Sequence, residues 1–582
     1  MKTTYVCKYT PLELMAAFGG EYENLNEMPE NFDLADQMVN PNICGFGKAL
    51  IQAVMSGKVK ELVLVNCCDT IRSVCDVLEA SGKLDYLYMI DMLHSGWGCS
   101  RERIAQQLIR FAKDYRAYKG SDFDEEKFRA AFHRPKKNDK PHLAVLGARM
   151  GSQLFDMVEK TMPYPVENES CVNNRSIGET MPPTLAKLQE ELLSGSQTEE
   201  EKADLYQPMT EDILDAPAFA RLMEWYAYEL IKQIPCMRMM DKTGRKQLYQ
   251  DPNLKGIIYH TVKFCDFYSF EYADLKQNTT LPIVKIESDY TVSSSGQLLT
   301  RLQAFAETLQ MDDMEGKELK MGKGYFAGVD SGSTSTDVVI LDKEGKMVCG
   351  IIVPTGAGAQ NSAEKALKKA LEETGLAEGD IDAIVTTGYG RTAIEAGDKS
   401  ITEITCHARG AHYLDPDVRT VIDIGGQDSK VIKLDEEGNV VNFVMNDKCA
   451  AGTGRFLEMM AHSLEMDLSE MSHHGLTHEE DITISSMCSV FAESEVVSLI
   501  AQNKTADDIV HGLNKSVATK TNALVKRVGG EEKYMMTGGV SKNEGLVKTL
   551  EEKIGSPIVI KSEAQLCGAL GAALFAKDMV VQ

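Results

Sequence analysis

Two cysteines in the second half of the chain lie in segments whose residue types suit the binding of a metal or a cluster. Cys449 belongs to residues 446–455 (NDKCAAGTGR), and Cys488 belongs to residues 485–495 (SSMCSVFAESE). Apolar residues at helical spacing follow each cysteine, which predicts a helix after each one. These residues are Phe456, Leu457, Met460 and Leu464 after Cys449, and Val490, Phe491, Val497 and Ile500 after Cys488. A helix start offers unpaired N–H groups and a partial positive charge, which favour a thiolate and any anion bound to it.

Two thiolates are half of the ligand set that an iron–sulfur cluster normally needs. A twofold axis between two chains would supply the other half. A zinc ion shared by four thiolates satisfies the same pattern, and so do two buried, unreactive cysteines. The spacing alone leaves all three interpretations open.

The first half of the chain is also rich in cysteine. The chain has 14 cysteines, and those before residue 310 are Cys7, Cys44, Cys67, Cys68, Cys75, Cys99, Cys171, Cys236 and Cys265. Disulfides are rare in a reducing cytosol, so this many thiols favour metal or cluster ligation. Because C-x-x-C pairs and ferredoxin-type spacings are absent, any such site is assembled from distant segments.

Length and charge limit the possible functions. A chain of 582 residues is too long for one core and predicts three or four domains. The formal charge of −25, from 62 basic and 87 acidic residues, argues against binding to nucleic acid or to an anionic membrane. The N-terminus lacks the apolar core of a signal peptide, and no stretch approaches the roughly 18 apolar residues of a membrane span. We therefore expect a cytoplasmic protein.

Alternating strands and helices organise the first 310 residues. Residues 60–66 (KELVLVN) predict a buried parallel strand, and residues 70–80 predict the helix after it. Cys67 and Cys68 then lie at the carboxyl end of that strand, where open α/β sheets bind their ligands.

A second unit of the same kind begins at residues 142–147 (HLAVLG), a predicted strand that a helix follows at 152–160. We expect two doubly wound, Rossmann-like α/β domains, at residues 1–140 and 141–310. The charged residues 311–324 predict a linker between domains.

Three small-residue turns in the second half suit a nucleotide. The predicted strand 325–329 runs into residues 330–337 (DSGSTSTD), whose exposed N–H groups suit phosphate oxygens, while Asp330 suits a hydrated Mg²⁺. The arrangement returns at residues 421–427, and a glycine pair at 536–541 would let a base and ribose approach the backbone. The residues expected to contact the nucleotide are Gly332, Ser333, Thr334, Ser335, Gly425, Gly426, Gly538 and Gly539. No P-loop motif is present.

The order of these three turns resembles the ATPase fold shared by actin, heat-shock chaperones and sugar kinases. This resemblance implies that residues 325–582 form two lobes that close over Mg·ATP or Mg·ADP.

Four motifs make a more specific resemblance, which covers about residues 325–580. The two cysteine segments, together with residues 386–391 (TTGYGR) and 401–407 (ITEITCH), resemble the 2-hydroxyacyl-CoA dehydratase activators, a family that includes the benzoyl-CoA reductase ATPase subunits. The resemblance implies a homodimer that shares one 4Fe–4S cluster. The residues it implies are the cluster ligands Cys449 and Cys488, and the Mg·ATP-site residues Asp330, Asp423 and Gln427.

The first 310 residues resemble, more loosely, the dehydratase subunits on which such activators act. The motifs are residues 235–238 (PCMR), 264–266 (FCD), 287–290 (ESDY) and 297–301 (QLLTR). The cysteine content is similar to that of the double-cubane branch, which reduces small molecules and implies an 8Fe double cubane or a second 4Fe–4S cluster. The expected ligands are Cys44, Cys68, Cys99, Cys171, Cys236 and Cys265. Cys67 and Cys75 are substitutes, and Cys7 is excluded as too near a free terminus.

The leading hypothesis is therefore an ATP-dependent electron-transfer enzyme. A ferredoxin- or flavodoxin-like donor would supply electrons to the shared cluster, and the N-terminal site would reduce a small molecule. A 2-hydroxyacyl-CoA dehydratase fused to its activator is one alternative, and an ATPase switch without redox chemistry is another. The substrate, the donor, the ligands and cluster type of residues 1–310, and transfer within or between chains stay open.

Overall fold

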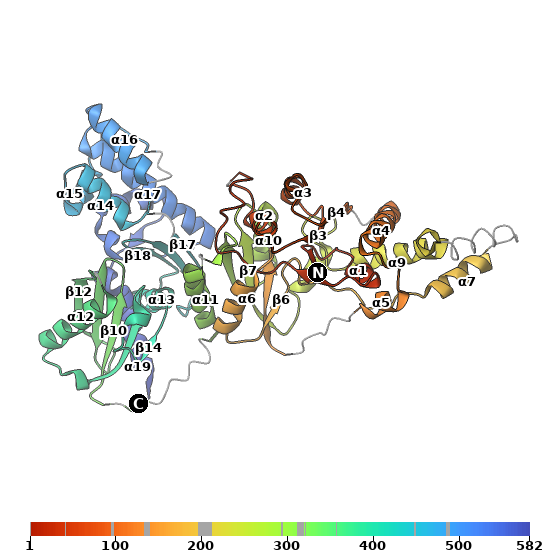
Figure 1. Ribbon diagram of the computed structural model, residues 1–582. Helices are drawn as coiled ribbons and strands as arrows, with labels where there is room; N and C mark the ends of the chain where they lie inside the picture. The colour runs from red at the N-terminus through yellow and green to blue at the C-terminus, as the bar shows by residue number, and fades with distance from the viewer. Residues whose placement is uncertain are drawn as a thin grey trace. The chain divides into compact units, whose positions relative to one another are not determined.

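The structure is a computed structural model that divides into two compact units (Figure 1). Unit 1 is Met1–Leu302, and unit 2 is Gln303–Gln582. The structure describes residues 2–581 except for 41, 95–97, 133–139, 196–211, 293–294, 311–318, 321, 357, 447–449 and 485–488. Most of the predicted linker 311–324 lies outside the described residues.

The first sheet of unit 1 contains four parallel strands in the order β2-β1-β3-β4. They are β1 (Thr3–Tyr5), β2 (Tyr22–Asn24), β3 (Glu61–Val65) and β4 (Tyr86–Ile90). β3 and α3 (Asp69–Ser81) confirm the strand and the helix predicted at 60–66 and 70–80. β1 lies between β2 and β3, so the strands that follow β1 in the sequence are added first on one side of it and then on the other. Open α/β sheets bind ligands at such a point, beyond the carboxyl ends of the strands.

The second sheet of unit 1 repeats this order as β6-β5-β7-β8, again with parallel pairing. Its strands are β5 (His142–Gly147), β6 (Val166–Asn168), β7 (Leu254–Val262) and β8 (Ile283–Ser288). β5 and α6 (Ser152–Thr161) confirm the predicted strand and helix at 142–147 and 152–160. The shared order supports a relation between the two halves of unit 1.

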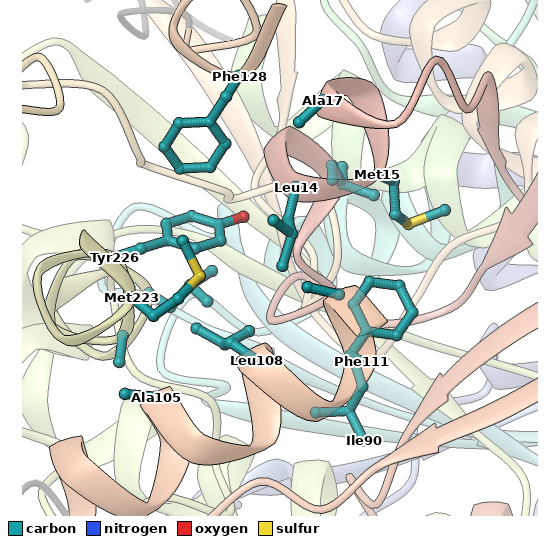
Figure 2. Close-up of a cluster of buried hydrophobic side chains, with 14 of the residues drawn as sticks. Leu14, Met15, Ala17, Ile90, Ala105, Leu108, Phe111, Phe128, Met223 and Tyr226 are labelled. Atoms are coloured by element: carbon teal, nitrogen blue, oxygen red, sulfur yellow. The ribbon is translucent and has the colours of Figure 1, made fainter. Parts of the chain in front are cut away.

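A helical core covers the first sheet of unit 1 (Figure 2). Leu14 of α1 (Leu12–Ala17), Phe111 of α4 (Gly98–Lys119), Phe128 of α5 (Glu125–Ala130) and Met223 of α9 (Pro217–Lys232) are all fully buried in it. Burial of large apolar side chains of this kind stabilises each by about 1.5–3 kcal/mol. The other helices of unit 1 are α2 (Gly45–Met55), α7 (Leu185–Gly195), α10 (Asp266–Asn278) and the 3-10 turns Ile213–Asp215 and Thr243–Leu248. The helix α11 (Ser295–Gln310) begins in unit 1 and ends in unit 2.

Unit 2 contains two five-stranded sheets with matching topology, β12-β11-β10-β13-β14 and β17-β16-β15-β18-β19. In each, three antiparallel strands precede two parallel ones, as the two lobes of the expected ATPase fold require. The strands of the first sheet are β10 (Tyr325–Ser331), β11 (Ser335–Leu341), β12 (Met347–Pro354), β13 (Ile381–Thr387) and β14 (Lys399–Ser400). Those of the second are β15 (Thr420–Ile424), β16 (Ser429–Leu434), β17 (Val440–Asn446), β18 (Tyr534–Thr537) and β19 (Ile558–Val559). A short pair joins β9 (Leu319–Lys320) to β20 (Val580–Val581).

Two helices, α13 (Glu403–Leu414) and α19 (Cys567–Asp578), pack closely against each other in unit 2. Glycine permits the contact, because a Cβ at Gly571 would lie 1.8 Å from the carbonyl oxygen of Cys406, and one at Gly410 would lie 2.2 Å from that of Cys567. The remaining α-helices of unit 2 are α12 (Ala359–Thr374), α14 (Gly454–Ser463), α15 (Leu468–His474), α16 (Ser489–Ala501), α17 (Ala506–Val528) and α18 (Glu544–Ile554).

None of the helices in the described part of the chain has the length and the apolar run that a bilayer span needs.

Candidate functional site

A cavity of about 560 Å³ lies between the glycine-rich turns of unit 2. Hereafter it is the nucleotide cavity. The first two turns have the same geometry, since the N–H of Gly332 donates to the carbonyl of Ser335 (2.9 Å) and that of Gly425 donates to the carbonyl of Asp428 (3.0 Å). Every predicted nucleotide-site residue lines this cavity: Asp330, Gly332, Ser333, Thr334, Ser335, Asp423, Gly425, Gly426, Gln427, Gly538 and Gly539.

Glycine lets the first two turns approach each other. A Cβ at Gly426 would lie 2.0 Å from Oγ1 of Thr334, which is far shorter than any non-bonded contact of a real Cβ atom. Gly538 has a φ of +80°, and a Cβ there would lie 2.7 Å from Oδ1 of Asp423. These positions therefore need glycine for packing and, at Gly538, for backbone conformation.

Buried carboxylates gather on one side of the nucleotide cavity. Asp330 comes from β10 and Asp423 from β15, one from each lobe. Burial, together with the carboxylates of Asp337 and Glu403, raises the pKa of Asp330 well above its usual range. Although burial opposes it, the influence of His407 and Lys430 holds the pKa of Asp423 well below its usual range.

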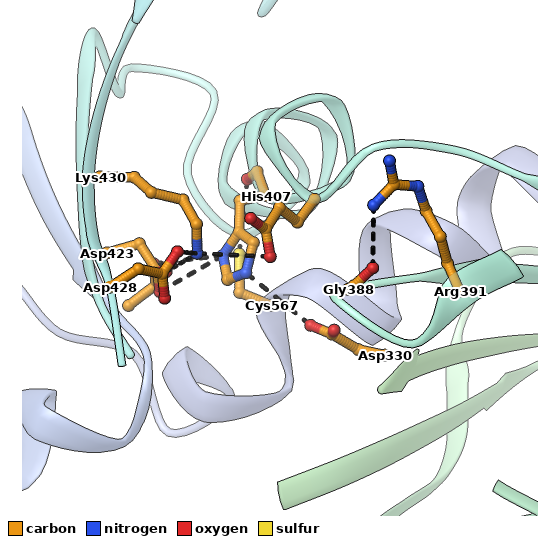
Figure 3. Close-up of polar contacts among 10 residues, drawn as sticks. Asp330, Gly388, Arg391, His407, Asp423, Asp428, Lys430 and Cys567 are labelled. Carbon is orange, nitrogen blue, oxygen red and sulfur yellow. Dashed lines mark hydrogen bonds and ion pairs between the residues drawn. The ribbon is translucent and has the colours of Figure 1, made fainter. Parts of the chain in front are cut away.

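One lysine compensates part of this negative charge (Figure 3). Lys430, on β16, has a side chain only 4% exposed, and its Nζ lies 2.9 Å from Asp423, 3.0 Å from Asp428 and 3.5 Å from Glu403. These three carboxylates raise the pKa of Lys430 against the effect of burial. Lys430 and Glu403 were not predicted from the sequence, although Glu403 lies in the quoted 401–407 motif and Lys430 follows the glycine turn at 421–427 within an apolar run.

His407, on α13, lies between the aspartates of the two lobes (Figure 3). Its Nε2 is 3.8 Å from Asp330, and its Nδ1 is 3.6 Å from Asp423. Thr537 donates its hydroxyl to Asp423 (2.9 Å) and lies 3.3 Å from His407 Nδ1. Burial lowers the pKa of His407, although the charge of Asp423 opposes this shift. The side chain therefore contacts both lobes at their closest carboxylates.

The chemistry of the cavity suits a hydrated divalent cation and a polyphosphate. Carboxylates outnumber Lys430, and the buried Oδ1 of Asp337 has no hydrogen-bond partner in the described part of the chain. Burial raises the pKa of Asp337 to about 7. Oxygen ligands with excess negative charge favour Mg²⁺, and the backbone N–H groups of the turns favour phosphate.

The predicted cluster ligands Cys449 and Cys488 lie outside the described residues, but the elements beside them are described. The predicted helices are confirmed as α14 and α16. The N–H groups of Gly454 and Arg455, at the start of α14, donate to the carbonyls of Gly425 (2.9 Å) and Gly426 (2.8 Å). The second glycine-rich turn, at Gly425 and Gly426, is thus hydrogen-bonded directly to the helix that follows Cys449.

The segment before Cys488 is also tied to the nucleotide cavity. Ser472 of α15 lines the cavity and accepts the N–H of Glu544 (2.9 Å). The chain that leaves α15 is fixed to α17, because Asp508 accepts the N–H groups of residues 479 and 480 (2.8 Å each) and Lys515 contacts Asp481 (2.6 Å). Hydrogen bonds therefore connect the cavity to α14 after Cys449, and the chain that leaves α15 leads from the cavity toward the segment of Cys488.

In unit 1, seven thiols gather near the carboxyl ends of the parallel strands. Cys7 follows β1, Cys67 follows β3, and Cys171 follows β6, while Cys265 precedes α10 after β7. Hereafter the thiol site is Cys7, Cys44, Cys67, Cys68, Cys171, Cys236 and Cys265. It includes the carboxyl ends of the neighbouring strands β1 and β3, where the strand order of the first sheet reverses.

Thiol pairs within this site are hydrogen-bonded to each other. The side-chain hydrogen bond from Cys265 lowers the pKa of Cys44 to about 7, although burial opposes it. Hydrogen bonds with Cys67 likewise lower the pKa of Cys7 and of Cys68, and they raise that of Cys67.

Electrostatic effects join these pairs into one group. The charge of Cys44 acts on the pKa of Cys68, that of Cys171 acts on Cys265, and those of Cys236 and Cys7 act on Cys171. The thiolate form is the one that binds metal, so lowered thiol pKa values favour ligation.

Two buried cations lie beside the thiol site without a carboxylate partner. Lys8 is 1% exposed, and its Nζ donates to Oδ1 of Asn174 (3.1 Å) and to the carbonyl of Ile234. Burial lowers its pKa to about 8, while the thiols of Cys236, Cys171 and Cys7 oppose this shift. Arg149, also buried, donates to the carbonyl of Val6 (3.1 Å). Neither cation forms an ion pair with a carboxylate among the described residues.

The structure revises the predicted ligand set of unit 1. Five predicted ligands belong to the thiol site: Cys44, Cys68, Cys171, Cys236 and Cys265. The side chain of Cys99 lies outside the described residues. The reason for excluding Cys7 does not hold, because Cys7 is buried and hydrogen-bonded to Cys67 rather than free at the terminus. Cys75 lies apart on α3, where burial raises its pKa to about 11. Among the described residues, no three side chains are arranged around a position for a single metal ion.

Comparison with known proteins separates the two halves of the chain. Residues 7–203 and 206–309 match the family model of the 2-hydroxyglutaryl-CoA dehydratase D-component. Residues 327–576 match the BadF/BadG/BcrA/BcrD ATPase family.

Three similar proteins each match less than half of this chain. The 2-hydroxyisocaproyl-CoA dehydratase activator of Clostridioides difficile is 46% identical over 254 residues, which are 44% of this chain and 95% of the relative. Its solved structure with bound ADPNP has a TM-score of 0.42 and is covered over 94% of its length. The (R)-2-hydroxyglutaryl-CoA dehydratase activating ATPase of Acidaminococcus fermentans is 44% identical over 43% of this chain and 96% of its own. A benzoyl-CoA reductase subunit of Thauera aromatica is 34% identical over 43% of this chain and 92% of its own.

The chain therefore belongs to the 2-hydroxyglutaryl-CoA dehydratase D-component family through residues 7–309 and to the BadF/BadG/BcrA/BcrD ATPase family through residues 327–576.

Proposed function

We propose that this protein uses ATP hydrolysis to drive electrons from a ferredoxin- or flavodoxin-like donor to the thiol site of unit 1, where a small molecule is reduced. Cys449 and Cys488, paired with their counterparts in a second copy, would hold a 4Fe–4S cluster. The thiol site would hold an 8Fe double cubane or a second 4Fe–4S cluster. Such clusters, when bound, accept and release single electrons.

The observation that carries this proposal is the thiol site itself. Seven thiols converge from distant segments on two buried cations, Lys8 and Arg149, that lack carboxylate partners among the described residues. Buried charges are normally paired or coordinate a metal. Thiolates that bind an anionic iron–sulfur cluster would place negative charge beside these cations.

The nucleotide cavity supplies the other half of the proposal. Asp330 and Asp423 would hold hydrated Mg²⁺ between the lobes, and the turns at Gly332 and Gly425 would bind the phosphates. Gln427, which lines the cavity, would orient the attacking water. His407, on α13, would fix the positions of the two aspartates relative to each other, because one ring nitrogen faces each carboxylate.

The hydrogen bonds from the cavity to the cysteine segments support coupling. A change of nucleotide at Gly425 and Gly426 acts on α14 through the N–H groups of Gly454 and Arg455. A change at Ser472 acts on the segment before Cys488 through α15. A ligand shifts an equilibrium only through contacts that differ between two states, and these bonds supply such contacts.

An exposed apolar face on α16 supports the homodimer. The apolar residues predicted after Cys488 are on the helix, but they face solvent in the single chain: Phe491 is 73% exposed, Val490 64% and Val497 57%. The opposite face, with Ala492 and Val496, is buried. Because this unpartnered face begins beside Cys488, a second copy that shares the cluster would cover it.

The direct test is iron and acid-labile sulfide per chain after anaerobic purification. One cubane per dimer and one double cubane per chain give about ten irons per chain. We expect Cys449→Ala to lose about two of them and Cys236→Ala to lose most of the other eight. Cys75→Ala is the matched control, because Cys75 is buried outside the thiol site. A colourless, iron-free wild type would overturn the redox proposal and leave zinc or no metal.

The oligomeric state tests the dimer separately. We expect Phe491→Glu to shift the protein from dimer to monomer in light scattering, since a carboxylate would have to be buried against the second copy. Val559→Glu is a control on another exposed apolar side chain of unit 2. An unchanged dimer in Phe491→Glu would show that α16 does not form the interface.

The names of the relatives favour a second candidate function. Three are an activator of 2-hydroxyisocaproyl-CoA dehydratase, an activating ATPase of 2-hydroxyglutaryl-CoA dehydratase and a benzoyl-CoA reductase subunit. Unit 1 would then dehydrate a 2-hydroxyacyl-CoA by a radical route after one electron is delivered. Incubation of the reduced protein with ATP and 2-hydroxyglutaryl-CoA separates the two: formation of the unsaturated thioester at catalytic rates selects the dehydratase.

A further inference from the structure

A second cavity, of about 380 Å³, lies on unit 1 and has no role in the function proposed above. Two segments form it, residues 237–242 and the first turns of α10. The residues that line it are Met237, Arg238, Met239, Met240, Lys242, Phe267 and Phe270. Hereafter it is the Arg238 cavity.

The charged residues that line the Arg238 cavity are both cationic. Neither Arg238 nor Lys242 forms an ion pair with a carboxylate in the part of the chain that the structure describes, and Nη1 of Arg238 is buried there without a hydrogen-bond partner. Two other arginines of unit 1 are paired with carboxylates: Arg245 contacts Glu271, and Arg175 contacts Glu13 at 2.5 Å. A buried donor without an acceptor costs free energy, so the chain itself leaves the hydrogen-bonding capacity of this guanidinium incompletely used.

The remaining walls of the cavity are apolar and partly exposed. Met240 is 73% exposed and Phe270 is 74% exposed, although large apolar side chains usually avoid water. The guanidinium carbon of Arg238 lies 4.7 Å from the centre of the Phe267 ring, which holds the cation beside the apolar wall. The cavity therefore offers cationic groups and an apolar surface to the same ligand.

The Arg238 cavity adjoins the thiol site. Cys236 is two residues before Arg238, and Cys265 caps the helix that carries Phe267 and Phe270. Phe264, next to Cys265, has a φ of +63°, a conformation that costs a non-glycine residue free energy and recurs at functional sites.

We propose that the Arg238 cavity binds a small organic anion, with its charged group on Arg238 and Lys242 and its apolar part against the methionines and phenylalanines. Its position beside the thiols makes it the subsite for the substrate that is reduced. That role rests on the proposed function, whereas anion binding itself does not.

Calorimetric titration of the anaerobically purified full chain tests this proposal. Phenylacetate is the probe, because it combines a carboxylate with a planar apolar group, and phenylacetamide is its neutral counterpart. We expect phenylacetate to bind once per chain, and phenylacetamide and inorganic phosphate to bind at least about tenfold more weakly, since a charge-assisted hydrogen bond is worth that factor or more.

Three variants assign the binding to this cavity. Arg238→Gln should weaken phenylacetate binding at least about tenfold, and Lys242→Gln about threefold, because Lys242 is more exposed to solvent screening. Lys246→Gln is the matched control, since Lys246 is exposed nearby but does not line the cavity, and it should bind as the wild type does. Lys242 is a surface residue, so its variant keeps the test valid even if Arg238→Gln unfolds.

Several results would overturn the proposal. Equal affinity for phenylacetamide would show that the cations do not recognise the ligand, and equal affinity for phosphate would exclude an organic anion as the class. No saturable binding of phenylacetate, or unchanged binding in both glutamine variants, would remove the site. Iron content keeps the two proposals distinct: an iron-free protein that still binds phenylacetate through Arg238 would lose only the substrate role.

Discussion

The nucleotide cavity of unit 2 and the thiol site of unit 1 both lie at the carboxyl ends of parallel strands, but the charges buried there are opposite. In unit 2, the carboxylates of Asp423, Asp428 and Glu403 surround one lysine, Lys430. In unit 1, Lys8 lies among thiols and backbone carbonyls and forms no ion pair among the described residues.

The difference shows what each site needs from a ligand. Carboxylates stay charged near neutral pH unless burial is severe, so unit 2 compensates them with its own lysine and still has negative charge for Mg²⁺. Thiols whose pKa is raised, such as Cys67 and Cys171, hold their protons until a metal displaces them, whereas the lowered pKa of Cys44 favours its thiolate. The metal-free thiol site therefore carries less negative charge than the filled site, and its cations become fully paired only when the remaining thiolates form. Four substitutions test this contrast.

The largest effect is expected from Lys430→Met. The change leaves the buried carboxylates of Asp423 and Glu403 and the half-buried one of Asp428 without this cation, and should lower the free energy of unfolding of unit 2 by about 3–5 kcal/mol. Lys433→Met on the same strand is the control, because the partly exposed pair of Lys433 with Glu531 is worth at most about 1 kcal/mol. Calorimetry of the nucleotide-free protein measures both. Equal costs would mean that Lys430 does not compensate the carboxylates.

Asp337→Asn tests the same negative charge through pH. The pKa of Asp337 is about 7 in the folded protein, above its ordinary value of 3.8, so the folded state favours the protonated form. Its contribution to stability is complete below about pH 4 and is lost as pH rises through about 7, by up to about 4 kcal/mol. We expect the variant to lack this loss between pH 4 and pH 8. Parallel stability curves for the variant and the wild type would contradict the shift.

Much of the nucleotide cavity could be predicted from the sequence because its turns are local. Residues 330–337 and 421–427 show their function in a few consecutive small residues, and the strands around them follow from apolar runs. Lys430 and Glu403 could not be assigned, because their role depends on which carboxylates the folded chain brings around them.

The thiol site was less predictable for the same reason. Its cysteines are up to 258 residues apart, and spacing along the chain is no measure of their separation in space. Cys7 was excluded because it is near the terminus. However, β1 is a central strand of its sheet, and Cys7 follows it at the position where the strand order reverses. The apolar spacing of α16 predicted the helix correctly, but spacing does not tell whether a face packs inside the chain or against another copy.

Gly426→Ala tests the close approach of the first two glycine-rich turns of the nucleotide cavity. The added Cβ would lie 2.0 Å from Thr334 Oγ1, so the turns must separate. Overpacking of this kind costs about 1–3 kcal/mol, which predicts an affinity for Mg·ADP about tenfold or more below that of the wild type. Gly379→Ala is the control, since nothing lies within 4 Å of the Cβ it would add. Calorimetric titration with Mg·ADP measures both, and unchanged affinity in Gly426→Ala would show that the turns tolerate separation.

The smallest effect is expected from Lys8→Met in the metal-free protein. Loss of the ammonium leaves Oδ1 of Asn174 and the carbonyl of Ile234 without their donor, which is unfavourable, but it also removes a buried charge, which is favourable. We expect the two to leave a net cost of about 1 kcal/mol, close to that of the surface control Lys58→Met.

Fluorescence separates this effect from unit 2, because both tryptophans of the chain, Trp97 and Trp225, belong to unit 1. Once iron and sulfide are bound, Lys8→Met should lose stability relative to the wild type, since the thiolates then lack a buried cation. The lysines of the two sites would thus differ in when they matter: Lys430 in the protein without ligands, and Lys8 only with the site filled. A metal-free cost as large as that of Lys430→Met would mean that Lys8 is already paired with thiolates, and the contrast between the two sites would be lost.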